Sequence, residues 1–368
     1  MGLTDCFMLT DLILLTRGAR LFPETRVQKF FNLLFMTVFF IRLTASSGLD
    51  IYGALAISGF NIFLVSNFTY IFFIVLFSVY LQCQRSRLQG FFRYALSLLP
   101  KHQLAFMTAL SKQNFRFFVI HLIGHLLCGI PLREGSLRWD YVLFHIYTRQ
   151  NTMMTRSLAG FLYIYEIVAL TMWIVIAFCV YNWAHLVKHR LLICLLDTLE
   201  AILTKSDMPL PLEKAIETTR LMKRIQEKFD QCFSFIAFLI FTCNFLQAPG
   251  YLIGQFTENA GNDLESKLQT IGFSSLYLSV ALMLVTTVNK RHSELKNRVS
   301  ELVDELAKCP HSCKWLIATR IQACVSRETA WGIFTIDESL IGTYAGHFLT
   351  FSVMFFQIIP KPVAHDDQ

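Results

Sequence analysis

Charged residues are scarce in this 368-residue chain: Asp, Glu, Lys and Arg together make up only 16% of it, whereas soluble domains usually carry about 25%. Hydrophobic residues account for 54%, and the mean hydropathy is +0.47. This shortage of charge excludes an ordinary water-soluble globular protein and predicts one that crosses a membrane several times. The net charge of +7 is attributed to loops on one side of that membrane and does not indicate a nucleic-acid partner.

Motifs for covalent chemistry and cofactor binding are also lacking. The chain has no P-loop, no glycine-rich dinucleotide fingerprint and no nucleophile elbow. Cys309, His311 and Cys313 form half of a zinc-binding pattern, but no second pair follows at a suitable spacing. The ten cysteines form no disulfide framework. We therefore predict that the protein is not an enzyme and that it uses no cofactor and no metal.

A cleavable signal peptide is not predicted. The apolar stretch Phe7–Thr16 is interrupted by Asp11, and Arg17 and Arg20 follow the stretch instead of preceding it. We interpret this stretch as a short interfacial or packing helix.

Seven stretches of the chain are apolar enough to be transmembrane helices, for which about 20 residues are needed. Of the 33 Lys and Arg residues, 26 lie in segments that are inside if the N-terminus is cytoplasmic, and 7 lie outside. The positive-inside rule therefore predicts a cytoplasmic N-terminus and, because seven is odd, an extracellular C-terminus. The predicted spans are Phe30–Ala45, Asn61–Leu81, Phe115–Pro131, Gly160–His185, Cys232–Gly254, Leu268–Val288 and Ser339–Ile359.

Three predicted cytoplasmic segments continue the helical periodicity of neighbouring spans. His185–Lys205 extends the fourth span until Pro209 and Pro211 interrupt it, and Leu212–Gln231 is an amphipathic helix leading into the fifth span. The segment Asn289–Lys308 extends the sixth span and carries one apolar stripe, which consists of Leu295, Val299, Leu302 and Leu306. The predicted fold is an all-α integral membrane protein with seven transmembrane helices and long cytoplasmic helical extensions.

The last apolar segment, Asp337–Ile359, differs from the others because polar residues recur along it. Five side chains fall within roughly 80° of one another on a helix; they are Thr343, His347, Thr350, Met354 and Gln357. A membrane helix with one polar stripe either packs inside a bundle, where polar groups hydrogen-bond to neighbouring helices, or lines water. The stripe alone leaves both interpretations open.

The C-terminal part of the chain resembles the insect gustatory receptor family. In that family the last span carries Thr-Tyr, five hydrophobic residues and Gln-Phe, and the corresponding residues here are Thr343, Tyr344, Thr350 and Phe351. The run Gly332–Asp337 resembles the Gly-x-Phe-x-Ile-Asp run that precedes this signature. The chain departs from the family pattern twice, because Thr350 replaces the signature Gln and His347 interrupts the hydrophobic five.

The resemblance implies a gustatory chemoreceptor of the plasma membrane, expected in the dendrites of sensory neurons. It also implies a homo- or heterotetramer with related subunits, which forms a non-selective cation channel that small-molecule tastants open. The departure at Thr350 leaves open a non-conducting or modulatory subunit. The alternative classes are a metabotropic, G-protein-linked receptor, which would need the reverse orientation, and a transporter in which Glu166, His121 and His125 relay protons.

These features divide the chain into five predicted parts. Residues 1–29 form a cytoplasmic N-terminal segment, and residues 30–288 form a ligand-binding bundle of the first six transmembrane helices with their extensions. Residues 289–338 form a cytoplasmic helical anchor region. Residues 339–359 form the seventh helix, which the resemblance assigns to the pore, and residues 360–368 form an extracellular tail.

The polar stripe predicts the chemistry of such a pore. Hydroxyl, imidazole and amide groups on the stripe would face a partly hydrated cation, and Met354 would form an apolar ring that excludes water from the closed pore. Because the stripe has no acidic residue, a poorly selective pore that favours monovalent cations is expected. Asp337 and Glu338 either concentrate cations at the cytoplasmic mouth or cap the last helix.

A ligand pocket is predicted near the extracellular side, where aromatic residues and a few polar groups share helix faces. Glu166 is the strongest candidate because a carboxyl group inside a span is unfavourable unless it faces water or a partner. Aromatic walls with few polar groups suit a small amphipathic tastant, although interhelical hydrogen bonds and an interfacial aromatic belt explain the same residues. The predicted pocket residues are Tyr70, Tyr163, Glu166, Trp173, Asn244, Gln247, Tyr251 and Tyr277.

Replacing Glu166 by Gln and Tyr251 by Ala tests this pocket. Each change should shift the ligand concentration that gives a half-maximal response, because it removes a charge or an aromatic wall that contacts the ligand. Surface expression should stay at the wild-type level, which surface labelling checks. Dose–response curves that coincide with the wild-type curve would count against the pocket.

Overall fold

The structure is a computed structural model that describes residues 62–129, 172–204, 210–257, 264–307, 312–325 and 328–358, together with Phe30, Thr37 and Ile41. Within these ranges the chain is almost entirely helical. The helices are α3 (Ile62–Cys83), α4 (Arg85–Leu98), α5 (Lys101–Gly129), α8 (Trp173–Thr204), α9 (Leu210–Thr257), α10 (Leu264–Ala307), α11 (Ser312–Cys324) and α12 (Glu338–Ile358). Between α11 and α12 lie two short strands, β1 (Thr329–Ala330) and β2 (Phe334–Thr335).

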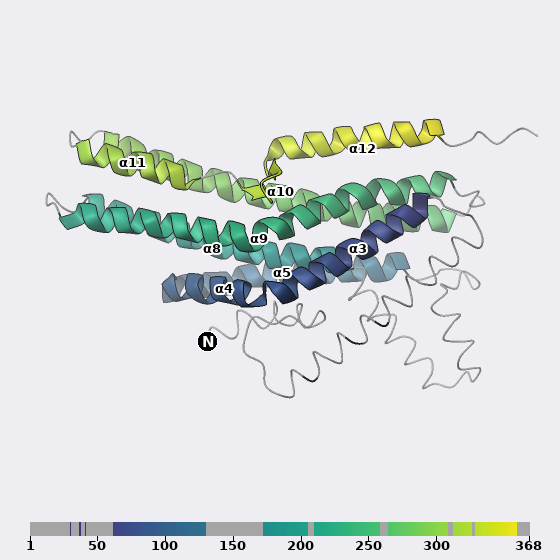
Figure 1. Ribbon diagram of the computed structural model, residues 1–368, viewed down its shortest axis with the longest axis horizontal. Helices are drawn as coiled ribbons and strands as arrows, with labels where there is room; N and C mark the ends of the chain where they lie inside the picture. Colours follow the sequence, from purple (N-terminus) through teal and green to yellow (C-terminus); the bar gives the residue numbers. More distant parts are fainter. Residues whose placement is uncertain are drawn as a thin grey trace, which may run out of the picture.

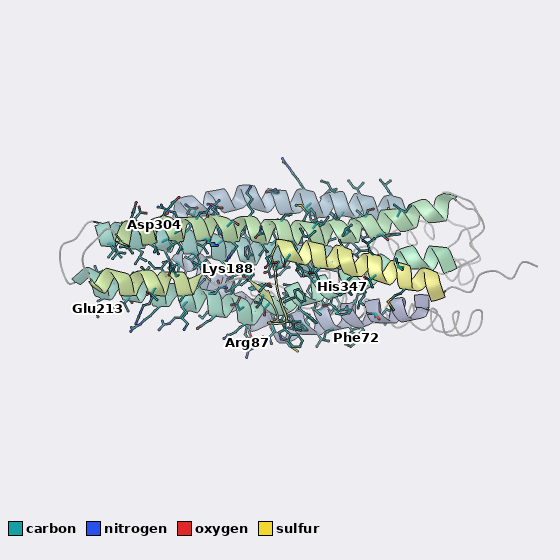
Figure 2. All side chains as sticks on the ribbon, turned by 90° about the horizontal axis from the view of Figure 1, so that it is seen from above. Phe72, Arg87, Lys188, Glu213, Asp304 and His347 are labelled. Atoms are coloured by element: carbon teal, nitrogen blue, oxygen red, sulfur yellow. The ribbon has the colours of Figure 1, made fainter. Side chains whose placement is uncertain are left out.

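Long helices run through both halves of an elongated bundle. The helices α8, α9 and α10 pack against one another, and α9 and α10 extend over nearly the whole length (Figure 1). α4 and α11 lie beside one half of the bundle, and α3 and α12 lie beside the other half. Figure 2 shows Glu213 and Asp304 toward one end, Phe72 and His347 in the opposite half, and Lys188 between them.

The predicted cytoplasmic extensions are confirmed as helices. α8 continues to Thr204, and α9 joins the predicted amphipathic helix and the fifth span in one helix of 48 residues. α10 does the same for the sixth span, and its predicted apolar stripe is buried at all four positions, which are Leu295, Val299, Leu302 and Leu306. Amphipathic periodicity continued past the end of each apolar run because the extensions pack against one another.

Other elements differ from the sequence prediction. α5 begins at Lys101, well before the predicted start at Phe115, because the residues between them continue the same helix. The short helices α4 and α11 and the two strands were not predicted. The predicted first span and the part of the fourth span before residue 172 lie, apart from the isolated residues named above, outside the described residues, as do residues 1–29 and the C-terminal tail.

Two stretches of the described chain are long and apolar enough to cross a membrane by length and composition, Glu213–Leu246 and Ile271–Leu306. Large apolar side chains are also exposed on four helices, which are α3, α5, α10 and α12. They include Phe72, Ile120, Ile123, Leu127, Leu282, Leu349 and Val353. Exposed apolar surface of this extent is typical of helices that face lipid or another chain.

Aromatic side chains fill the core where the two halves of the bundle meet. Phe229 and Phe233 on α9 are stacked, with ring centroids 5.2 Å apart. Phe91 of α4 packs edge-on against Phe233 at 5.2 Å, and Tyr181 of α8 packs edge-on against Phe229 at 5.6 Å. This cluster joins three helices and fixes the short helix α4 against the long ones.

The aromatic cluster should dominate the stability of this region. Because Phe229 is almost completely buried, Phe229→Ala should destabilise the protein by about 3–5 kcal/mol through lost burial and the resulting cavity. Lys223→Ala, at an exposed position of the same helix, should change stability by less than about 0.5 kcal/mol. Thermal unfolding of the purified full-length chain in detergent measures both, and equal midpoints for the two variants would contradict this assignment.

Candidate functional site

The helix α12 lies on the outside of the bundle. It packs against α9 and α10 along one side only (Figure 1). Consequently Thr343, His347, Thr350 and Met354 of the polar stripe are exposed. The side chain of Gln357 lies outside the described residues, as does that of the signature residue Phe351.

The two threonine hydroxyl groups of the stripe have a defined orientation. Thr343 Oγ1 donates to the carbonyl oxygen of Ser339 at 3.0 Å, and Thr350 Oγ1 donates to that of Gly346 at 2.8 Å. Each hydroxyl proton is therefore used within the helix. The lone pairs of both oxygens remain available as acceptors on the exposed side.

Tyr344 and His347 mark the edge of the stripe that meets α9. The Tyr344 hydroxyl donates to the backbone carbonyl oxygen of Asn244 at 2.8 Å. The ring of Phe245 packs edge-on against both side chains, at 5.9 Å from Tyr344 and 5.3 Å from His347. His347 is thus exposed and yet held against α9, so it lies at the border of the polar stripe, whereas Thr343 and Thr350 face outward.

A row of phenylalanines on α9 receives α12 and the segment before it. Spacings of three, three and four residues place Phe235, Phe238, Phe241 and Phe245 on one helix face. Trp331 packs on Phe235 and Phe238, at centroid distances of 5.0 and 5.2 Å. Phe334 packs edge-on against Phe241 at 5.5 Å. The row therefore sets the position of the hairpin and of α12 along α9.

The strands β1 and β2 form an antiparallel hairpin that leads directly into α12. Thr329 pairs with Thr335 and Ala330 with Phe334. Trp331 and Gly332 at the turn have φ angles of +52° and +69°, in the left-handed region that glycine tolerates best. The family-like run Gly332–Asp337 is thus the return half of this hairpin.

Asp337 is the N-cap of α12. Its Oδ1 accepts the Ser339 backbone N–H at 3.0 Å and the Ser339 hydroxyl at 2.5 Å. The capping interpretation of Asp337 is therefore confirmed, because a carboxylate at this position satisfies an otherwise unpaired N–H group. The side chain of Glu338 lies outside the described residues.

The base of the hairpin is tied to the bundle by a buried ion pair. Glu328, which precedes β1, forms a salt bridge with Lys188 of α8, and the two side chains are only 6% and 2% exposed. The imidazole of His185 lies 3.8 Å from the same Glu328 oxygen. Lys188 Nζ also lies 4.1 Å from the centre of the Phe229 ring, where a cation is attracted to the aromatic face.

Hydrogen bonds continue from this ion pair across the bundle. Arg291 of α10 donates to the side-chain oxygen of Asn182 at 2.8 Å and contacts His185 Nδ1 at 3.2 Å. Asn182 in turn donates to Asn114 Oδ1 of α5 at 2.5 Å. One polar network therefore connects α5, α8, α10 and the base of the hairpin.

The network lies at one level of the bundle. Its members on the helices lie within three residues of three predicted span ends, which are Phe115, His185 and Val288. Next to Lys188 along α8, His189 contacts Glu294 of α10 at 3.2 Å. Burial lowers the pKa of His189 to about 4, although Glu294 raises it in part, so the imidazole is neutral at pH 7. The apolar and charged parts of the long helices meet at this polar layer.

The predicted ligand-pocket residues are dispersed where the structure describes them. The Trp173 ring contacts Phe77 of α3 at 5.5 Å, and the Tyr277 ring contacts His125 of α5 at 6.0 Å. Asn244 is fully buried and meets α12 through Tyr344. Tyr163 and Glu166, as well as the side chains of Tyr70, Gln247 and Tyr251, lie outside the described residues. The pocket as a whole stays a prediction.

The two histidines of α5 are buried at the contact with α10. His121 Nε2 lies 2.8 Å from the Ser279 hydroxyl, and His125 Nδ1 lies 2.8 Å from the His121 carbonyl oxygen. In the described part of the chain, His125 Nε2 has no hydrogen-bond partner although it is buried. It lies beside Phe273 and Tyr277.

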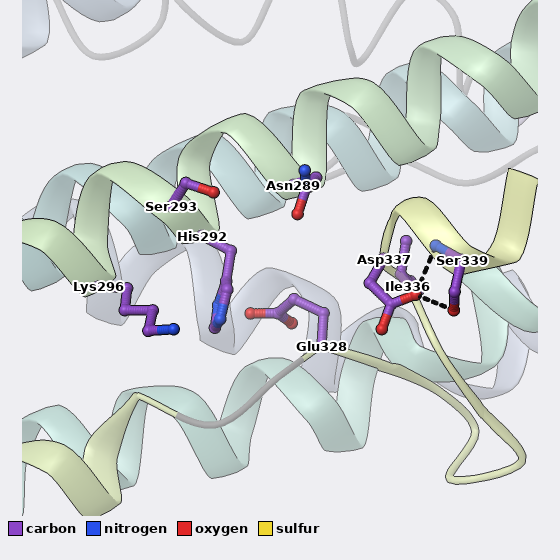
Figure 3. Close-up of a pocket in the computed structure, with 8 residues that line it drawn as sticks. All are labelled: Asn289, His292, Ser293, Lys296, Glu328, Ile336, Asp337 and Ser339. Atoms are coloured by element: carbon purple, nitrogen blue, oxygen red, sulfur yellow. Dashed lines mark hydrogen bonds between the residues drawn. The ribbon is translucent and has the colours of Figure 1, made fainter.

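A polar cavity of about 350 Å³ lies where α10 passes the hairpin and the start of α12 (Figure 3). Four of its lining residues follow one face of α10 at spacings of three, one and three residues. The other four come from the hairpin and the first turn of α12. The lining residues are Asn289, His292, Ser293, Lys296, Glu328, Ile336, Asp337 and Ser339.

Sequence reasoning missed the polar network and the cavity. In the sequence, Lys188 and Arg291 look like ordinary basic residues near span ends that are predicted to be cytoplasmic, which the positive-inside rule already explains. Glu328 lies 140 residues from Lys188 in the chain, and nothing local marks it as a partner. The paired histidines of α5 were visible as an i, i+4 pattern, and their burial agrees with a packing role.

The fold defined by these elements is that of a chemoreceptor of known structure. The structure of the insect olfactory receptor OR5 from Machilis hrabei matches 95% of this chain and 97% of its own, with 16% sequence identity and a TM-score of 0.69. The structure of the same receptor in complex with eugenol matches 97% of this chain and 98% of its own, with 15% identity and a TM-score of 0.60. No protein-family model matches the sequence, and no curated protein does.

The buried ion pair predicts strong coupling between hairpin and bundle. Lys188→Met and Glu328→Gln should each destabilise the protein by about 3–5 kcal/mol, because each leaves one charge buried without its partner. The double variant should lose much less than the sum. Lys223→Met, which removes the exposed pair with Glu227, should cost at most about 0.5 kcal/mol. Unfolding midpoints of the four variants check this, and strictly additive losses would contradict the coupling.

Proposed function

We propose that this chain is a subunit of a ligand-gated, poorly selective cation channel that acts as a chemoreceptor in the plasma membrane. The observation that carries the proposal is the fold, which matches an insect olfactory receptor over nearly the full length of both chains. The resemblance of Thr343, Tyr344 and Phe351 to the gustatory receptor signature supports the gustatory branch and tastants as ligands.

The orientation of the hydroxyl groups on α12 supports a pore. Thr343 and Thr350 donate to their own helix, so their oxygens would face permeating ions as acceptors. Met354 is exposed on the same helix and supplies the apolar ring that would exclude water in the closed state. Because no carboxylate lies on the stripe, strong selection for divalent cations is not expected.

The exposed side of α12 supports assembly with further subunits. Gly342 and Gly346 are one turn apart, and a Cβ atom built at either position would meet open space. Small residues at this spacing allow two membrane helices to approach closely. Four copies, or four related subunits, would bring four such helices around one axis, as the family resemblance implies.

A small amphipathic ligand is the expected opener. Eugenol, which is bound in one of the matching structures, belongs to this chemical class. The contact of α5 with α10 offers aromatic rings and the acceptor His125 Nε2, which has no partner among the residues that the structure describes. Glu166 and Tyr251 of the predicted pocket would complete a site on the extracellular side of the polar network.

The proposed orientation places the polar network at the cytoplasmic membrane boundary and the C-terminus outside the cell. The excess of Lys and Arg in the predicted cytoplasmic segments supports this topology. A metabotropic receptor would have the opposite orientation. A tag at the C-terminus of the full chain, stained without permeabilising the cells, distinguishes the two.

A cysteine substitution on the exposed side of α12 tests the pore. Cells that express Thr350→Cys, with G-protein signalling blocked, should give a ligand-evoked current that a water-soluble thiol reagent reduces. The reduction is expected because the reagent would add bulk and charge beside the ion path. Whole-cell recording under a panel of tastants measures the current.

Tyr344→Cys is the matched control, because Tyr344 faces α9 on the same helix and its thiol should react slowly. Wild-type channels control for the native cysteines. If the reagent leaves the Thr350→Cys current unchanged, this face of α12 does not line the pore. If the chain reaches the surface but stays silent alone, current that appears only with related subunits would indicate a modulatory role.

A further inference from the structure

The polar cavity beside the start of α12 has walls of opposite charge. α10 provides Lys296 and His292 on one wall, and the hairpin provides the Glu328 carboxylate on the other (Figure 3). Ser293 and Ser339 line the space as well. Its volume of about 350 Å³ falls in the range of small-ligand sites, which is roughly 300–1,000 Å³.

The opposite charges face the cavity without neutralising each other. Glu328 pairs with Lys188 through Oε1, and the contact with His185 uses the same atom. Within the described residues, Glu328 Oε2 has no partner, and the carboxylate points into the cavity in Figure 3. Lys296 likewise forms no ion pair in the described part of the chain, although its Nζ points into the same space.

This arrangement favours a ligand that carries both signs of charge. A simple anion would pair with Lys296 but would be repelled by the nearby Glu328 carboxylate. A simple cation would pair with Glu328 but would be repelled by Lys296. A compact zwitterion would place its anionic group by Lys296, His292 and Ser293, and its ammonium group by Glu328 Oε2. Charge-assisted hydrogen bonds of both kinds would then form together.

The cavity lies at the level expected for lipid headgroups. Asn289 directly follows the predicted end of the sixth span at Val288, and Ser339 begins the predicted seventh span. Both ends are cytoplasmic in the proposed topology. A ligand at this height would therefore be within reach of the inner leaflet, where a lipid phosphate and its substituent lie just outside the hydrocarbon region.

We propose that the cavity binds a phosphate–amine zwitterion of the phosphoethanolamine type, supplied by the headgroup of an inner-leaflet phosphatidylethanolamine. Lys296 holds the phosphate, and Glu328 accepts a hydrogen bond from the primary ammonium. The headgroup contacts α10, the hairpin and the first turn of α12 together. Occupancy therefore stabilises the position of α12 against the bundle.

The test measures binding to the full-length chain, purified in maltoside detergent and free of phosphate. Thermal unfolding midpoints are recorded while the protein is titrated with dihexanoyl phosphatidylethanolamine. The lipid should raise the midpoint in a saturable manner. Lys296→Gln should raise the half-maximal concentration at least tenfold, and Lys290→Gln, an exposed lysine of the same helix outside the cavity, should leave it unchanged.

Three further titrations separate the parts of the ligand. Dihexanoyl phosphatidylcholine should act much more weakly, because its quaternary ammonium cannot donate a hydrogen bond to Glu328. Stabilisation by the ethanolamine lipid but not by free phosphoethanolamine identifies the membrane headgroup as the source, and stabilisation by both supports the same site with a soluble source. Inorganic phosphate alone should have little effect.

Several outcomes would overturn the proposal. Inorganic phosphate stabilising the protein as strongly as the ethanolamine lipid would remove the role of Glu328. A Lys296→Gln response equal to that of Lys290→Gln would remove the site. If the ethanolamine lipid does not raise the unfolding midpoint, the proposed site is also excluded. Since none of these titrations involves a current, failure of this site and failure of the proposed channel function are distinguishable.

Discussion

The buried ion pair between Lys188 and Glu328 is the constraint on which the attachment of the hairpin and the start of α12 depends. Each charge loses its hydration on burial, and the loss is compensated only while both partners stay in place. The pair thereby forces the base of the hairpin to follow α8. Arg291 and Asn182 extend the same requirement to α10 and α5. The position from which α12 starts is therefore determined jointly by α5, α8, α10 and the base of the hairpin.

Beyond this polar layer, α12 is held by apolar contacts instead of by charges. The phenylalanine row of α9 holds Trp331 and Phe334 of the hairpin and then Tyr344 and His347 of α12. Such contacts tolerate small sliding movements, because many weak dispersion interactions replace one another at little cost. The ion pair between Lys188 and Glu328 does not tolerate such sliding, because the geometry of the pair must be retained. The start of α12 is therefore held more strictly than its middle.

The sequence predicts the long apolar helices and their extensions, whereas the short helices α4 and α11 and the contacts between helices could not be read from it. The predicted last span Ser339–Ile359 nearly coincides with α12, and the apolar stripe of α10 is buried as expected, because length and periodicity are local properties. The pocket prediction grouped Trp173, Asn244 and Tyr277 as aromatic and polar residues on shared helix faces, and in the structure they contact Phe77, Tyr344 and His125, respectively. Which neighbour a helix face meets is decided by packing across the bundle. The partners of Glu328 are equally non-local, and strands of two residues leave no readable pattern.

The unbroken course of α9 has a mechanical consequence. A helix of 48 residues is about 72 Å long at 1.5 Å per residue, and a rod of this kind acts as a lever. If it pivots at the polar layer near its middle, a tilt of about 2° displaces each end by roughly 1 Å, in opposite directions. A small rearrangement around a ligand at one end would thus reach the far end as an opposite displacement, without any bending of the helix itself.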